Sequence, residues 1–278
     1  MKSGIILTSP SPREAARLAA LAESAGWDGV FTWDGVALGE TETYDPWVTM
    51  AAMAVTTERV RLGAVIVPPA RRRPWKLARE AMSIDVLSNG RLVLPVGLGA
   101  LDDQAWANVG EPTAARIRAE KLDESLAILD GLWSGEPFGF HGRHYAFEPM
   151  TFLPRPVQQP RIPIWPVALW PNPRSMRRAL RWDGGVIQLQ VEDSAPGMVT
   201  PEHVGEIAAY AERERPAELR GRPWEIVVDG TTRPGDAEAL ARVRDLAAAG
   251  ATWYLEADWL DTDPVALETR VAAGPPSL

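Results

Sequence analysis

Hydrophobic positions along the chain alternate between short apolar runs and longer amphipathic stretches, most clearly over residues 60–100. Val60–Val67 is a nearly continuous apolar run, as expected for a parallel strand that is covered on both faces. A predicted helix begins at Pro74 and ends at Asn89-Gly90, two residues that tolerate left-handed backbone. A second apolar run over Leu92–Leu98 then completes a βαβ unit.

This pattern repeats along the whole chain. The predicted strands are Gly4–Leu7, Gly29–Trp33, Val60–Val67, Leu92–Leu98, Ile162–Leu169, Gly185–Gln190, Glu225–Val228 and Thr252–Glu256. Four predicted helices begin with a capping side chain followed by proline. The capping residues are Ser11, Asp45, Thr200 and Asp263. Repetition of strand, capped helix and glycine predicts an α/β fold, a (β/α)8 TIM barrel forming a single domain over residues 1–278. An open, doubly wound sheet is the alternative.

The longest interval separates the fourth and fifth predicted strands. Residues 113–133 fit one long amphipathic helix, and residues 134–161 are rich in proline, glycine and aromatic residues. We expect the second segment to be an insertion over the barrel mouth or a small hairpin, because linkers are seldom so aromatic. Pro95 and Pro166 fall inside predicted strands, so a local distortion is expected at both.

Composition narrows the class of partner. The chain has 278 residues, a formal net charge of −8 and no cysteine. An acidic protein does not attract nucleic acid or an anionic membrane over long range, so we expect a small-molecule partner. The absence of cysteine excludes disulfides and cysteine nucleophiles. No apolar stretch is long enough to span a bilayer, and the first residues lack a signal-peptide pattern, which predicts a cytoplasmic protein.

Candidate chemistry is expected at the carboxyl ends of the predicted strands, where barrels of this type place their active sites. The motifs for nucleotide phosphates, dinucleotides, zinc proteases and serine hydrolases are missing, and none of the three histidines follows a predicted strand. We therefore expect no metal site. Arg71 is either part of a solvated charge run or an anion ligand. Gly97 and Gly99 either relieve crowding or let a flat ligand approach, and Trp33 and Trp170 either pack in the core or stack on a planar partner.

Several segments together resemble the luciferase-like flavin-dependent oxidoreductases, a family that includes bacterial luciferase-type monooxygenases and deazaflavin-dependent reductases. The segments are Ala22–Asp34, Thr57–Gly63, Arg71–Glu80, Ser83–Arg91, Gly97 with Gly99, Leu129–Trp133 and Trp170–Gly185. No single segment would suffice, but their order along the chain is specific as a set.

The resemblance implies a flavin, FMN, at the barrel mouth. Its ring would lie over the ends of the third and fourth strands, and its phosphate would lie near the loop after the fifth strand. The residues implied for cofactor binding are Val67, Pro68, Arg71, Gly97, Gly99, Ala168, Trp170, Asn172, Arg174 and Ser175. From their position at the end of the second strand, Trp33 and Asp34 are the candidate catalytic residues, with Asp34 either orienting the substrate or a nearby base or only capping a turn.

Three functions remain open from the sequence. The first is a monooxygenase that acts on a small organic molecule with reduced FMN and oxygen, the flavin being reduced with NAD(P)H by a separate reductase. The second is a reductase or dehydrogenase that uses the deazaflavin coenzyme F-420. The third is a cofactor-free barrel, because Gly35 stands where many relatives carry histidine and Val167-Ala168 where many carry two glycines. The resemblance also implies a homodimer through the helices beside the second and third strands.

Overall fold

The computed structural model of the chain describes residues 1–8, 10–190, 197–233, 236–261 and 263–276. The barrel strands are β1 Lys2–Ile6, β2 Gly29–Thr32, β3 Arg61–Ala64, β4 Leu94–Val96, β7 Ile164–Trp170, β8 Gly184–Leu189, β9 Glu225–Gly230 and β10 Trp253–Glu256. The helices are α1 Pro12–Ser24, α2 Pro46–Ala54, α3 Pro74–Leu87, α4 Ala115–Trp133, α5 Pro173–Ala179, α6 Pro201–Glu214, α7 Ala237–Ala248 and α8 Pro264–Ala273. Short 3-10 turns are η1 Pro69–Arg71, η2 Ala107–Val109 and η3 Ala217–Leu219.

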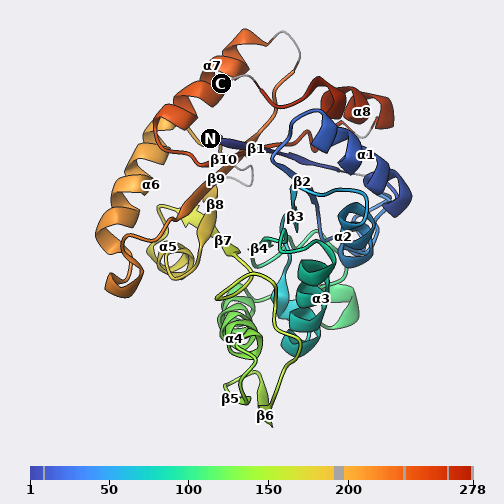
Figure 1. Ribbon diagram of the computed structural model, residues 1–278. Helices are drawn as coiled ribbons and strands as arrows, with labels where there is room; N and C mark the ends of the chain where they lie inside the picture. The colour runs from blue at the N-terminus through green and yellow to red at the C-terminus, as the bar shows by residue number, and fades with distance from the viewer. Residues whose placement is uncertain (9, 191–196, 234–235, 262, 277–278) are drawn as a thin grey trace.

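The eight strands form one parallel sheet in the order β3-β2-β1-β10-β9-β8-β7-β4. Parallel bridges Leu62↔Leu92 and Val67↔Val96 join β3 to the β4 segment and complete the ring. Figure 1 shows the helices surrounding these strands. The predicted (β/α)8 barrel is therefore confirmed, and all eight predicted strands are present with small shifts of their ends.

The helix signals in the sequence behave as predicted. The side chains of Ser11, Asp45, Thr200 and Asp263 each accept a backbone N–H of the helix that follows. Asn89, after α3, has φ +54°, in the left-handed region that ends a helix. These local devices fix where each helix leaves the barrel wall, and thus where each βα loop begins.

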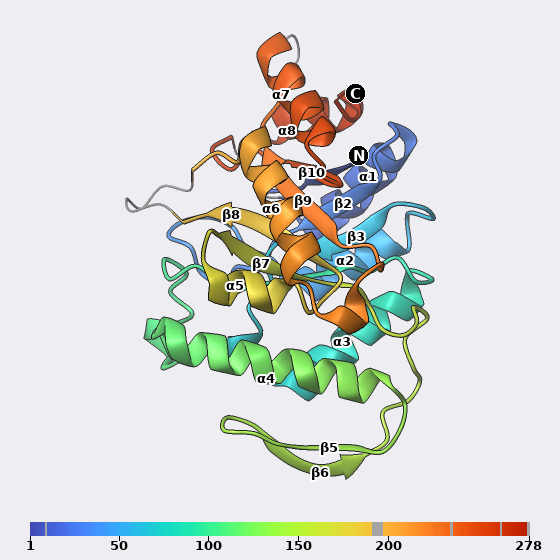
Figure 2. The same cartoon turned by 90° about the vertical axis from the view of Figure 1, so that its left-hand side faces the viewer.

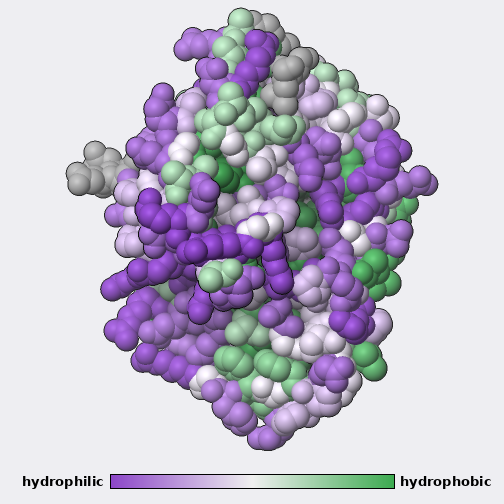
Figure 3. All heavy atoms as spheres, turned by 60° about the vertical axis from the view of Figure 1, so that its left-hand side comes forward, coloured by the Kyte–Doolittle hydropathy of each residue, from purple (hydrophilic) through white to green (hydrophobic). Residues whose placement is uncertain are grey.

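Side chains fill the lower part of the barrel. The interior cluster contains Ile6, Phe31, Val93, Trp165, Val186, Val227, Trp253, Leu255 and Ala257. Because inward and outward residues alternate along a strand, these residues also identify the inward face of each strand. The packed interior leaves the carboxyl ends of the strands as the open end. Figure 3 shows that hydrophilic side chains predominate on the face over the left-hand helices of Figure 1.

Of the two alternatives for residues 134–161, the structure has the small hairpin and not an insertion over the barrel mouth. Its hairpin, β5 Phe138–His141 and β6 Ala146–Met150, packs outside the barrel against α3 and α4 (Figure 2). Phe147 lies 5.9 Å from Trp75 between ring centroids, and Glu124 of α4 accepts the backbone N–H groups of Arg143, His144 and Tyr145. The aromatic residues thus cover two helices rather than the barrel mouth.

Both strand prolines lie within paired strands. β4 and β7 stay in register from Leu94↔Ile164 to Val96↔Pro166, with Pro95 opposite Trp165. The expected distortion is therefore not found in this pairing, although β4 is only three residues long. None of the helices in the described ranges combines the length and apolar character that crossing a bilayer requires.

Candidate active site

A cavity of about 990 Å³ lies at the carboxyl ends of the barrel strands. Its lining comes from the ends of β2, β3, β4, β7 and β8, from the loop after β10, and from the first turns of α4 and α5. The volume falls within the range of pockets that bind cofactors and small molecules. The cavity thus occupies the position where a barrel of this type gathers residues from distant parts of the chain.

One side of the cavity is an apolar slot. Val65 and Ile66, directly after β3, face Val167 and Leu169 on β7, and Leu98 follows β4. The peptide bond between Val65 and Ile66 is cis. Because none of these side chains has a polar group, the slot suits the face of a flat apolar ring.

The opposite wall is aromatic. Trp33 donates its indole N–H to the carbonyl of Thr8, which fixes the orientation of its ring. Trp259 packs edge-on against Trp33, with ring centroids 6.5 Å apart and an interplanar angle of 84°. Both indoles line the cavity.

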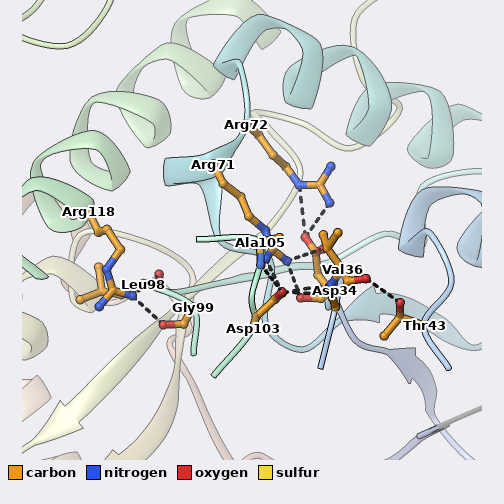
Figure 4. Close-up of polar contacts among 11 residues, drawn as sticks. Asp34, Val36, Thr43, Arg71, Arg72, Leu98, Gly99, Asp103, Ala105 and Arg118 are labelled. Carbon is orange, nitrogen blue, oxygen red and sulfur yellow. Dashed lines mark hydrogen bonds and ion pairs between the residues drawn. The ribbon is translucent and has the colours of Figure 1, made fainter. Parts of the chain in front are cut away.

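Asp34 and Asp103 are held in a buried network of ion pairs (Figure 4). Asp34, whose side chain is 0% exposed, pairs with Arg71 at 3.0 Å and with Arg72 at 2.7 Å. Arg71 also pairs with Asp103, which accepts the backbone N–H groups of Val36, Ala37 and Ala105. One arginine therefore ties together the loops after β2, β3 and β4.

The network lowers the pKa of Asp103. Burial alone would raise the pKa of Asp103, but the hydrogen bonds from Arg71 and the three backbone N–H groups lower it below the ordinary value of 3.8. The two terminal nitrogens of Arg71 donate to two carboxylates and the Asp34 carbonyl, so its charge is already paired within the protein, although its buried Nε has no partner among the described residues. Arg71 lines the cavity but organises its loops rather than offering a cation to a ligand.

The open rim beside α5 carries the remaining cations. Arg178 of α5 pairs with Asp123 of α4, and Arg116 pairs with Glu120 one turn further along α4. Arg174 also lines the cavity and has no ion-pair partner within the described ranges. It is the residue at this rim best able to meet an anionic group.

The other two rim residues are engaged internally. The side chain of Asn172 accepts the N–H groups of Arg174 and Ser175, and thereby caps α5 itself. The hydroxyl of Ser175 donates to the carbonyl of Val167 and accepts the N–H of Leu169. Both residues line the cavity, but these groups already have partners within the chain.

The two glycines after β4 are required by packing. A Cβ atom on Gly97 would lie 2.8 Å from Ile66 and 2.9 Å from Val167. On Gly99, whose φ is +79°, it would lie 2.7 Å from the ring of Trp106. The close neighbours of Gly97 and Gly99 therefore support the interpretation that these glycines relieve crowding. Both glycines also line the cavity.

Most of the residues selected from the sequence meet in this cavity. They are Trp33, Asp34, Pro68, Arg71, Gly97, Gly99, Asn172, Arg174 and Ser175. Three others point outward from the barrel. Val67 and Ala168 are completely buried between strands and helices, and Trp170 packs on Tyr210 of α6 at 5.4 Å. The strand alternation that places Val167 and Leu169 inside places Ala168 and Trp170 outside.

Sequence reasoning missed much of the lining. Val167 and Leu169 could have been found from the alternation, because they share the inward face of β7 with Trp165. The sequence gives no indication that α4 lines the cavity with Arg116, Glu120 and Asp123. In the sequence, these residues look like the solvated face of an amphipathic helix. None of the three histidines lines the cavity.

The family model for luciferase-like monooxygenases matches residues 2–270. The chain belongs to this luciferase-like family. Solved structures with the same fold include monooxygenase RslO1 from Streptomyces bottropensis, at a TM-score of 0.79 and 23% identity over 98% of this chain and 96% of that one. The coenzyme F420-dependent tetrahydromethanopterin reductase from Methanopyrus kandleri has a TM-score of 0.73 and 15% identity over the same shares.

Two curated relatives differ in the cofactor that their names give. The oxygenase component of a flavin-dependent trigonelline monooxygenase from Acinetobacter baylyi is 29% identical over 69% of this chain and 49% of its own length. An F420-dependent glucose-6-phosphate dehydrogenase from Microbacterium testaceum is 31% identical over 55% of this chain and 46% of its own. The chain thus spans about half the length of the curated relatives that it matches.

The structure accounts for the absence of a side chain at position 35, where the luciferase-like resemblance expects histidine. A Cβ atom on Gly35 would lie 2.1 Å from the ring of Trp33 and 2.7 Å from Leu38. The indole of Trp33 therefore occupies the space that a side chain at position 35 would need. This luciferase-like barrel has an aromatic wall at that point instead of an imidazole.

Proposed function

We propose that this protein is a flavin-dependent monooxygenase that acts on a small organic molecule with reduced FMN and oxygen. The observation that carries the proposal is the apolar slot at the mouth of a closed barrel, with Arg174 at its open rim. Membership of the luciferase-like family supports an oxidoreductase, and the Acinetobacter relative is a flavin-dependent oxygenase component.

The residues present fit FMN in two respects. Val65, Ile66 and Val167 offer an apolar surface for a planar ring, and Arg174 offers a cation for a phosphate. The helix N–H groups after Asn172 are already capped, so the arginine is the phosphate contact that we propose. When bound, a flavin supplies the redox chemistry. The chain's own residues position the ring, exclude water with the indoles of Trp33 and Trp259, and leave room for a substrate.

Two partners follow from this proposal. The chain lacks a dinucleotide fingerprint, so a separate reductase would supply reduced flavin at the expense of NAD(P)H. The Acinetobacter relative, named as an oxygenase component, supports such a division of labour. We also propose a homodimer through α2 and α3, where Val48, Val86, Leu87 and the α2 C-cap residue Val55 are exposed.

A deazaflavin-dependent dehydrogenase is the second candidate function. Arg174 shares one rim of the cavity with Arg116 and Arg178, which are paired with the carboxylates of Glu120 and Asp123. If a cofactor displaces these carboxylates, the rim can meet more than one of its anionic groups. Several curated relatives of about this identity are F420-dependent dehydrogenases. This candidate would transfer hydride without oxygen.

A spectroscopic titration distinguishes the candidates. The purified protein is titrated with FMN and with the deazaflavin coenzyme while the visible spectrum is followed. We expect FMN to bind and the reduced complex to consume oxygen. Arg174→Ala should weaken FMN binding by about tenfold or more, because a charge-assisted hydrogen bond to phosphate is lost.

Arg177→Ala is the matched control, since Arg177 lies on the same helix, is exposed and does not line the cavity. Its affinity for FMN should equal that of the wild type. Binding of the deazaflavin alone would favour the dehydrogenase, and binding of neither coenzyme would leave the cofactor-free barrel as the better description.

A further inference from the structure

Asp229 is a carboxylate on the inward face of the barrel. Along β9 it lies two residues after Val227, which belongs to the interior cluster, and its register partner on β10 is Leu255 of the same cluster. Neighbours in register on parallel strands point to the same side of the sheet. Since Asp229 is exposed while Val227 and Val228 are buried, we conclude that its exposure is toward the barrel mouth.

The barrel geometry gives the depth of this group. In an eight-stranded barrel, the level rises by about one residue in register from each strand to the next. Followed around the ring, this brings Asp229 level with Val65 on β3 and Val167 on β7, both of which line the cavity. Trp33 and Gln188 then form the layer above it. Asp229 therefore lies at the floor of the mouth.

This carboxylate has no cation of its own. No ion pair to Asp229 occurs in the described ranges, and the residues outside those ranges include no lysine, arginine or histidine. The surrounding barrel wall, which disfavours the charged form, raises the pKa of Asp229. The four carboxylates that the described residues contribute to the cavity lining, by contrast, are already paired with arginines: Asp34, Asp103, Glu120 and Asp123. A carboxylate in apolar surroundings is stabilised by a partner that brings positive charge.

We propose that the floor of the mouth binds the ammonium group of an amine, with Asp229 as its counter-ion. The indole of Trp33 offers a π face to the same cation, and the side-chain carbonyl of Gln188 offers a hydrogen-bond acceptor. An anionic group at the same place would be repelled by the uncompensated carboxylate of Asp229. Charge is thus separated along the mouth, with Arg174 in the cavity lining at the rim and Asp229, placed by its strand register, at the floor. Binding of the amine does not depend on the proposed function. If the protein is the proposed monooxygenase, we propose that this amine is its substrate, and that step rests on the proposed function.

Calorimetric titration of the whole chain near neutral pH tests the site with three probes of similar shape: benzylamine, benzyl alcohol and benzoate. We expect benzylamine to bind about tenfold or more tightly than either of the others. Equal or tighter binding of benzoate or benzyl alcohol would overturn the proposal, as would the absence of benzylamine binding at millimolar concentration. This comparison needs no variant.

Asp229→Asn keeps the shape of the side chain and removes its charge, so it should abolish the preference for benzylamine. Glu225→Gln is the matched control, because Glu225 lies on the same strand at the opposite end of the barrel, near Lys2. It should bind benzylamine like the wild type. An unchanged preference in Asp229→Asn would exclude this residue. Titration with FMN is run in parallel, so that loss of amine binding with intact FMN binding contradicts this inference alone, and the reverse contradicts the proposed function alone.

Discussion

At the scale of single residues, the cavity depends on charges that neutralise one another inside the protein. Asp34, Arg71 and Asp103 are nearly inaccessible to solvent, and their ion pairs join three loops that are far apart in sequence. Removing one partner of such a buried pair leaves the other charge uncompensated, at a cost of about 3–5 kcal/mol. We therefore interpret these residues as positioning groups for the cavity wall.

Gly99 provides a test of the packing interpretation at one position. Gly99→Ala should lower the free energy of unfolding by about 2 kcal/mol more than Gly110→Ala, because the new methyl group meets Trp106 and Pro68. Gly110 is the control, since its φ of +77° carries the same backbone strain but nothing lies within 4 Å of the added Cβ. Urea denaturation of both variants gives the two values. Equal losses would mean that packing at Gly99 is unimportant.

At the scale of elements, the sequence predicts strands and helix starts well, because apolar runs and capping residues are local signals. The inward face of a strand is harder to predict, since the barrel strands carry apolar residues on both faces. This is why Ala168 and Trp170 were selected in place of Val167 and Leu169. The position of the β5-β6 hairpin could not be predicted from its local sequence either, because its aromatic residues pack on residues of other helices.

The outer face of α2 gives a prediction at the same scale. Val48 and the C-cap residue Val55 are 58% and 66% exposed and stand seven positions apart, so they lie on one side of the helix. If this face pairs with a second copy, the wild type should sediment as a dimer and the double variant Val48→Lys, Val55→Lys as a monomer. Val265→Lys, at an equally exposed valine on α8, should stay dimeric. A monomeric wild type would contradict the homodimer.

At the scale of the whole molecule, the closed barrel was predictable because the βα syntax recurs along the entire chain. The barrel rule also located most of the site, since it needs only the strand ends. What it could not supply was the wall contributed by α4 and the pairing of Asp34 with Arg71 and Arg72. These contacts arise only when the ring closes and brings separate loops together.

The free energy of unfolding of the whole chain should depend on pH through the titration of Asp103. Its folded-state pKa lies below the ordinary value, so its contribution is complete above that value and is lost as the pH falls toward the lowered one. In Asp103→Asn this contribution is missing, and the variant should be less stable near neutral pH by about 2–4 kcal/mol. Urea denaturation at a series of pH values should show that the difference narrows below about pH 4. A constant difference would rule out this linkage.

The indole of Trp33 above Gly35 makes the two positions interdependent. An imidazole introduced at position 35 alone has no room, whereas a smaller residue at position 33 would first open a gap in the aromatic wall. A change to histidine at position 35 therefore requires a change at position 33 as well. If the two changes occur one after the other, their order decides whether the intermediate keeps its pocket.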